Sequence, residues 1–224
     1  MARQLSFDLP VRPALGRDDF FLSPANAEAV AMIEGWQGWP SRKLILAGPA
    51  GAGKTHLTHV WAALSGARII AARDLPDADI PTLAQGPVAV EDAHLIAGDR
   101  AAEDALFHLH NLTLAEGHTL LITARTAPHL WGLTLPDLAS RMQGTLLTEL
   151  HAPDDALLSA VLMKLFADRQ LSPSPDTIPY LVRRIERSFE AARDIVEALD
   201  AQALADARPI TRSLAARVLD NPGE

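Results

Sequence analysis

Hydrophobic residues along this chain fall into short apolar runs separated by amphipathic stretches. The runs with the length and composition of buried strands are residues 43–47, 68–72, 88–90, 119–123 and 145–150. Helical spacing of apolar residues is found between them, at 56–64, 101–116 and 135–142. Strands that alternate with helices favour an α/β fold in which a parallel sheet is covered on both faces.

The two ends of the chain have different patterns. Residues 1–17 contain two prolines and no periodicity, which predicts an extended tail, and Ser23-Pro24 then opens a helix that should end near Gly35. Strand signals stop after Pro153, and helices are predicted at 154–169, 174–187, 188–207 and 210–219. We therefore expect a tail at 1–17, an α/β domain at 18–152 and a small all-α domain at 153–224.

Composition narrows the classes of function. The chain has 20 Lys and Arg against 28 Asp and Glu, a net charge of −8, which argues against a protein that mainly wraps nucleic acid. It has no cysteine, so disulfides and zinc-thiolate sites are excluded and a reducing cytoplasm is the expected location. No run reaches the roughly 20 apolar residues of a membrane span, and the N-terminus lacks the apolar stretch of a signal peptide.

The strongest chemical motif is Gly48–Thr55, GPAGAGKT, which matches the P-loop pattern G-x-x-x-x-G-K-[ST] between a predicted strand and a predicted helix. Backbone N–H groups of such a loop point at phosphate oxygens, and the helix N-terminus adds a favourable dipole. We expect Lys54 to reach the β- and γ-phosphates of ADP or ATP, and Thr55 to ligate Mg²⁺. The loop residues expected to contact phosphate are Pro49, Ala50, Gly51, Ala52 and Gly53.

An acidic pair follows the apolar run at 88–90. P-loop NTPases carry an acidic residue at the end of a neighbouring strand. Glu91 is expected in the magnesium shell and Asp92 as the catalytic group that orients the attacking water. Solvated loop acids are the alternative interpretation.

The residues around the loop resemble the bacterial replication initiator DnaA, an AAA+ protein. The segment GKTHLTH at 53–59 is similar to the DnaA stretch G-K-T-H-L-x-H, and residues 19–26 are similar to the segment that packs around adenine. Residues 106–117 and 121–123 resemble the helix and sensor 1 strand. The resemblance covers about residues 18–205 and implies an AAA+ domain followed by a helical lid. It also implies nucleotide contacts from Phe20, Phe21, Leu22, Asn26 and His56.

Leu138–Met142, LASRM, resembles the L-x-S-R-F segment that carries the arginine finger of DnaA-related proteins. The resemblance implies that Arg141 acts catalytically in trans, on a phosphoryl group held by another subunit. A surface salt bridge, worth at most about 1 kcal/mol, is the alternative role.

Among DnaA-related proteins, the pattern is most similar to the Hda-like regulators that inactivate DnaA. We expect no helix-turn-helix domain after the lid, and the tail is similar to a motif that binds the β sliding clamp. The residues of that motif are Gln4, Leu5, Ser6, Phe7, Asp8 and Leu9. Leucine and phenylalanine side chains in such a peptide act as apolar anchors. The resemblance implies DnaA and the DNA polymerase III clamp as partners, contact with DNA only through the clamp, and self-association as a further possibility.

Two departures from the family pattern bear on catalysis. Glu91 stands where the family has Asp, and its extra methylene disfavours a tight octahedral magnesium site, so weak intrinsic hydrolysis is expected. Glu190 stands at the sensor 2 position, where an arginine that contacts the γ-phosphate is expected. Either Arg193, one turn further along, replaces it or γ-phosphate sensing is lost. Loss is favoured, and with it ADP as the resident nucleotide.

Other candidates and functions stay open. The histidine pairs His56/His59 and His108/His110 lack a third ligand at metal-site spacing, so structural roles are favoured. The chain is predicted to be a regulator that stimulates ATP hydrolysis by DnaA. The alternatives are a stand-alone AAA+ ATPase and a non-hydrolysing adaptor that loads or tethers a DNA-bound partner.

Overall fold

The computed structural model describes residues 21–220, whose centre is a five-stranded parallel sheet. The strands lie in the order β2-β3-β4-β1-β5. Their bounds are β1 Lys43–Ala47, β2 Arg68–Ala71, β3 Val88–Glu91, β4 Leu120–Ala124 and β5 Leu146–Glu149. All pairings are parallel. The predicted α/β fold class is therefore confirmed.

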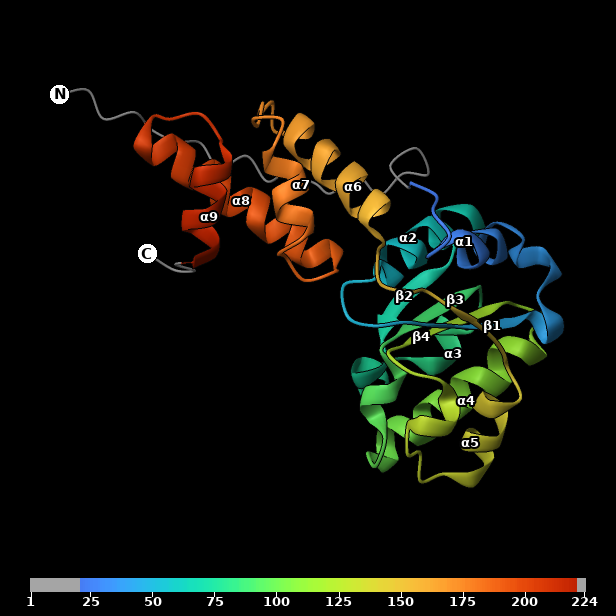
Figure 1. The fold of residues 1–224 in the computed structure, drawn as a ribbon. Coiled ribbons are helices and arrows are strands. Elements are labelled where there is room, and N and C mark those ends of the chain that lie inside the picture. The colour runs from blue at the N-terminus through green and yellow to red at the C-terminus, as the bar shows by residue number, and fades with distance from the viewer. Residues whose placement is uncertain (1–20, 221–224) are drawn as a thin grey trace.

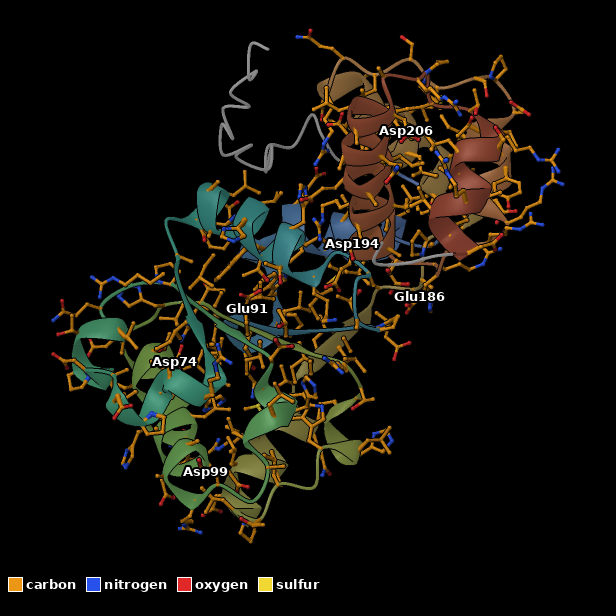
Figure 2. All side chains as sticks on the ribbon, turned by 90° about the vertical axis from the view of Figure 1, so that its left-hand side faces the viewer. Asp74, Glu91, Asp99, Glu186, Asp194 and Asp206 are labelled. Atoms are coloured by element: carbon orange, nitrogen blue, oxygen red, sulfur yellow. The ribbon has the colours of Figure 1, made fainter. Side chains whose placement is uncertain are left out.

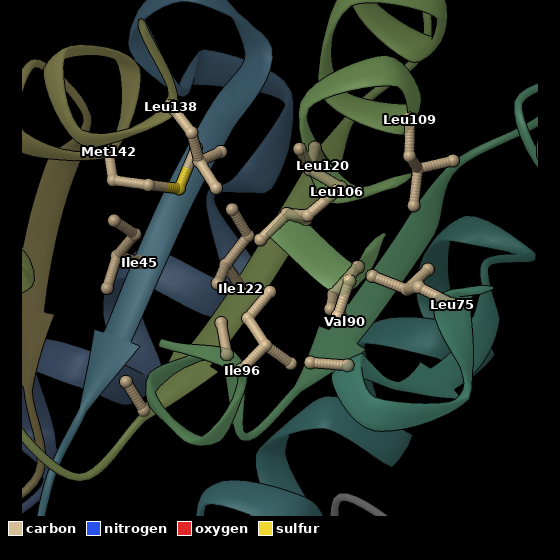
Figure 3. Packing of buried hydrophobic residues seen from close by; sticks show 14 of the residues in the cluster. Ile45, Leu75, Val90, Ile96, Leu106, Leu109, Leu120, Ile122, Leu138 and Met142 are labelled. Atoms are coloured by element: carbon tan, nitrogen blue, oxygen red, sulfur yellow. The ribbon is translucent and has the colours of Figure 1, made fainter. Parts of the chain in front are cut away.

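Helices cover both faces of the sheet (Figure 1). The helices α1 Ala27–Glu34 and α2 Lys54–Ser65 lie on one face, and α3 Ile80–Leu83, α4 Arg100–Ala115 and α5 Pro136–Gln143 lie on the other. Alternate strand residues point to opposite faces, so Leu44 packs towards Trp61 of α2 while Ile45 packs towards Leu106 and Leu138. Figure 3 shows the second of these cores, under α4 and α5.

The C-terminal helices form a separate bundle with its own core. They are α6 Asp155–Asp168, α7 Thr177–Val182, α8 Phe189–Asp206 and α9 Arg212–Asp220. Leu162, Phe166 and Val196 are buried between them. Among residues 21–220, no helix is long and apolar enough to cross a membrane.

Two predicted helix boundaries were wrong. The helix expected over 174–187 is only Thr177–Val182, because the chain turns before Ser188, whose Oγ accepts the Ala191 N–H at 3.0 Å and caps α8. Pro24 lies in a turn before α1 rather than in its first helical turn. In that turn the Asn26 side chain accepts the Ser23 N–H at 2.9 Å.

A fully buried carboxylate ties α4 to the segment that precedes α5. Glu103 accepts the N–H groups of Gly98 at 2.8 Å, Thr134 at 3.0 Å and Leu135 at 2.6 Å, and the Thr134 hydroxyl at 3.0 Å. Burial opposes ionisation, but the hydrogen bonds from Thr134, Gly98 and Leu135 outweigh it and hold the pKa of Glu103 below its usual value. The start of α5 is thereby fixed to the core.

We expect Glu103→Gln to lower the free energy of unfolding by about 2–4 kcal/mol at pH 7, because the amide NH₂ faces backbone donors and has no acceptor there. The Glu103 contribution is present above the unfolded pKa, near 4.5, and is lost as pH falls through the lower folded pKa. The variant should therefore lose part of the acid dependence of stability. Urea unfolding at pH 7 and across pH 3–5 measures both effects. The exposed Glu116→Gln is the control, and equal stability of the two variants would contradict the assigned role.

Candidate functional site

The P-loop lies, as predicted, between β1 and α2 at the carboxyl edge of the sheet. Gly48 follows β1 and donates its N–H to the Ala124 carbonyl oxygen at the end of β4, at 3.1 Å. Gly53 has φ +100° and directly precedes α2, which starts at Lys54. The predicted phosphate-binding residues are thus contiguous with a helix N-terminus, the arrangement that favours anions.

Lys54 is held over this loop. Its Nζ donates to the carbonyl oxygens of Gly48 at 2.7 Å and Pro49 at 2.8 Å, and the side chain is buried. Burial lowers the pKa of Lys54, the carboxylate of Asp92 raises it, Arg125 lowers it and Glu91 raises it. The ammonium therefore sits among the charged groups at the ends of β3 and β4.

The C-terminal helical bundle, predicted as the lid, packs directly on the P-loop through the start of α8. The sequence analysis did not predict this contact. The Phe189 N–H, in the first residue of α8, donates to the Gly51 carbonyl oxygen at 2.8 Å. A Cβ added at Gly51 would lie 2.4 Å from the Ser188 Cβ, and one at Gly53 would lie 2.9 Å from the Phe189 ring. Both glycines also have positive φ. They are required for the loop conformation and for close approach of the lid.

The acidic pair lies at the same edge of the sheet. Glu91 ends β3, and its Oε1 is buried with no hydrogen-bond partner among residues 21–220. The Asp92 side chain is exposed, and its backbone is in the left-handed region with φ 57°. The Asp92 N–H donates to Thr123 Oγ1 of β4 at 3.1 Å. Figure 2 shows Glu91 at the sheet, on the side towards the helical bundle that carries Glu186 and Asp194.

These residues fit a nucleotide-bound magnesium ion. The orphaned Glu91 oxygen and the exposed Thr55 hydroxyl in the first turn of α2 are oxygen ligands of the kind that Mg²⁺ prefers. In the part of the chain that the structure describes, no cluster of three His, Cys, Asp or Glu side chains could hold a metal by itself. The ion would therefore need phosphate oxygens and water to complete its shell.

Two more residues belong to this site and were not predicted. Arg125 follows Ala124, whose carbonyl oxygen bonds the first residue of the loop. Both ring nitrogens of His94 are buried without a hydrogen-bond partner in the described residues. Burial lowers the pKa of His94, while Asp92 opposes this shift and Arg125 and Lys54 add to it. The available signal for Arg125 was its position immediately after an apolar strand.

The predicted adenine-side residues are only partly visible. Phe20 lies outside the described residues, and Phe21 and Leu22 are exposed. Asn26 is buried, and its Nδ2 donates to the Phe21 carbonyl oxygen at 2.8 Å, so it shapes the segment that leads into α1. His56 lies in the first turn of α2. Adenine contact by these residues stays a prediction.

The sensor 2 candidates lie near the start of α8. Glu190 and Arg193 are both exposed, in the first and second turns of that helix. The lid reaches the P-loop through Ser188 and Phe189 instead. Whether Arg193 replaces the sensor 2 arginine stays a prediction.

Arg141 lies at the amino ends of the strands, whereas the P-loop lies at their carboxyl ends. Its carbonyl oxygen accepts from Nζ of Lys43, the first residue of β1, at 3.2 Å, whereas the P-loop follows the last residue of that strand. A five-residue strand is about 16 Å long. The Arg141 side chain is exposed and forms no ion pair within the described segment. Contact of Arg141 with a group on another subunit stays a prediction.

Comparison with known sequences gives relatives of low identity. No family model matches the chain. It is 28% identical over 134 residues to the chromosomal replication initiator DnaA of Thermomicrobium roseum, a match that covers 58% of this chain and only 28% of that protein. It is also 27% identical over 187 residues to an uncharacterized protein of Haemophilus influenzae, covering 77% of this chain and 79% of the relative.

Solved structures match the fold more completely. Domain III of the Thermotoga maritima replication initiation protein DnaA has a TM-score of 0.81 at 16% identity, covering 95% of this chain and 98% of that one. AMPPCP-bound DnaA from Aquifex aeolicus has a TM-score of 0.71 at 14% identity, with 84% and 66% covered. The Thermotoga maritima RuvB branch migration motor has a TM-score of 0.72 at 17% identity, with 92% and 71% covered. The described chain therefore has a DnaA-like AAA+ fold, that of DnaA domain III.

Proposed function

We propose that this protein is an Hda-like regulator that stimulates hydrolysis of ATP bound to DnaA. In this proposal it holds an adenine nucleotide at its own P-loop, docks on the β sliding clamp through residues 4–9, and presents Arg141 to the ATP of DnaA. The product is ADP-bound DnaA, inactive for initiation. The observation that carries the proposal is the exposed Arg141, which has no ion pair with any residue of 21–220 and lies at the opposite end of β1 from the chain's own P-loop.

Nucleotide binding is supported by the loop and its surroundings. The backbone of residues 49–53, the Lys54 ammonium and the N-terminus of α2 provide the donors and the positive potential that a diphosphate requires. Glu91 and Thr55 would hold Mg²⁺ on the phosphates, where the ion would neutralise their charge. One of the structures of similar fold is DnaA bound to AMPPCP, an adenine nucleotide analogue.

We propose ADP as the resident nucleotide. Glu190 places a carboxylate at the sensor 2 position, and the α8 contacts to the loop come from Ser188 and Phe189. A carboxylate at this position would repel a γ-phosphate, which favours the diphosphate. Asp92 would orient the attacking water in any intrinsic hydrolysis, which Glu91 in the metal shell makes weak.

Arg141 has the chemistry that the trans reaction needs. A guanidinium stabilises the charge that develops on the transferring phosphoryl group, and an arginine supplied across an interface accelerates hydrolysis by about 10³–10⁵ in known switch systems. In this structure its charge is not neutralised by a carboxylate of residues 21–220. Its guanidinium is therefore available to a phosphate.

One assay separates the proposal from its alternatives. DnaA is preloaded with labelled ATP and mixed with DNA-loaded clamp and this protein, and hydrolysis is followed with each component omitted in turn. Hydrolysis that needs all components supports the regulator. Hydrolysis by this protein alone would indicate a stand-alone ATPase, and complex formation without hydrolysis would indicate an adaptor.

The tail provides an independent prediction, although it lies outside the described residues. Replacing Gln4, Leu5 and Phe7 together with alanine should eliminate clamp binding, because the glutamine donor and two apolar anchors are lost. Nucleotide affinity should be unchanged, since the P-loop is formed by residues 48–55. Co-elution with the clamp and calorimetry with ADP measure the two properties. Wild-type clamp affinity of the triple variant would show that the tail is not the anchor.

A further inference from the structure

Lys43 is a buried lysine at the start of β1 without a carboxylate partner in the described residues. Its ammonium instead contacts His110 Nε2 at 3.2 Å and donates to the Arg141 carbonyl oxygen at 3.2 Å. Burial lowers the pKa of Lys43, and the neighbouring Arg141 guanidinium lowers it further. A buried cation beside a second cation is costly, so its position requires a reason beyond packing.

His110 completes the polar network around this ammonium. The imidazole is buried on α4, and its Nδ1 lies 3.0 Å from Asn111 Oδ1. With Nδ1–H donating to that oxygen, Nε2 is left as the acceptor for Lys43. Burial lowers the pKa of His110, the hydrogen bond to Asn111 opposes this shift, and Lys43 and Arg141 add to it. The neutral, accepting form is therefore the one that the surroundings favour.

The network ends on the last turn of α5. The Arg141 carbonyl oxygen also accepts the Thr145 hydroxyl at 2.7 Å, so two side-chain donors hold this backbone group. The other end of the helix is held by Glu103, which accepts the N–H groups of Thr134 and Leu135. Both ends of the helix that carries Arg141 are thus fixed to the core.

We infer that Lys43 and His110 are positioning residues for Arg141. Lys43 fixes the backbone of Arg141 through its carbonyl oxygen, and the repulsion between the two cations biases the guanidinium outward, towards a partner's phosphate. His110 keeps the Lys43 ammonium in place. This inference rests on the proposed function, because it assigns the two residues a role in the trans reaction of Arg141.

The first test measures positioning without any partner. Lys43→Met retains an apolar stem but removes the donor, and hydrogen exchange is followed at the Gly144 and Thr145 amides, which close the end of α5. Protection there should fall by about tenfold. The matched control is Arg42→Met, which removes a neighbouring exposed cation bonded to the Leu114 carbonyl oxygen. It should leave protection at α5 unchanged. Equal protection in Lys43→Met and wild type overturns the inference.

The second test measures the reaction. Lys43→Met should lower the maximal rate of hydrolysis of DnaA-bound ATP by about tenfold or more, with the half-saturating concentration unchanged, because docking is intact and only finger geometry is lost. In an Arg141→Ala background, Lys43→Met should have no further effect. An additional loss in that background would show that Lys43 acts independently of Arg141 and would overturn the inference.

Variants of His110 guard against a folding defect in Lys43→Met. His110→Gln keeps an acceptor for the ammonium and should retain exchange protection and most of the rate, whereas His110→Leu should lose both. Equal behaviour of the two variants contradicts a positioning role. If Arg141→Ala hydrolyses at the wild-type rate, the proposed function fails, and the exchange measurement still decides whether Lys43 fixes α5.

Discussion

Arg141→Ala is expected to abolish stimulation of ATP hydrolysis in DnaA, with a loss of about 10³-fold or more in the maximal rate. In the proposed mechanism the guanidinium contacts only the transition state of a reaction on another subunit, so clamp docking and binding of the protein's own nucleotide should be retained. The fold should be unaffected, because the side chain is exposed and the contacts that hold α5 use the Arg141 backbone.

Arg141→Lys should fail nearly as completely as Arg141→Ala. A lysine ammonium lacks the planar, two-pronged donor geometry with which guanidinium binds phosphate. Arg100→Ala is a matched control, because this arginine is also exposed on a neighbouring helix but is paired with Asp104 at 2.9 Å. The assay is single-turnover hydrolysis of labelled ATP in DnaA with DNA-loaded clamp. Wild-type hydrolysis rates with Arg141→Ala would refute the role of Arg141 as an arginine finger and would favour the non-hydrolysing adaptor function.

Lys54→Ala should lower affinity for ADP and ATP by about a hundredfold or more, because it removes the buried cation from the phosphate site. The domain should still fold, since the Lys54 ammonium bonds only two loop carbonyl oxygens, those of Gly48 and Pro49. Calorimetry with each nucleotide in the presence of Mg²⁺ measures the change.

The control for Lys54→Ala is His59→Ala, on the second turn of the same helix. It should bind nucleotide with wild-type affinity, because the phosphate donors come from the loop and the first helical turn. Unchanged affinity of Lys54→Ala for both nucleotides would remove the phosphate-binding assignment of the loop.

Much of the fold follows from local sequence. Runs such as Leu44–Leu46 are apolar without interruption, as strands buried on both faces are, and the residues between them have helical spacing. The P-loop was equally predictable, because a helix N-terminus and its glycines are contiguous in the chain. The predicted helix over 174–187 was wrong because its periodicity did not reveal the turn before the Ser188 cap.

The sequence by itself thus determined the α/β order of elements, the position of the P-loop motif between β1 and α2, and the position of the acidic pair 91–92 at the end of β3, all of which depend on neighbouring residues. Only the tertiary structure brought Phe189 onto Gly51, Arg125 beside the P-loop, and Lys43 with His110 under Arg141. In the sequence, Lys43 is 67 positions from His110 and 98 positions from Arg141. No local pattern of hydrophobicity encodes them, because they depend on strand order and on which helix covers which face of the sheet.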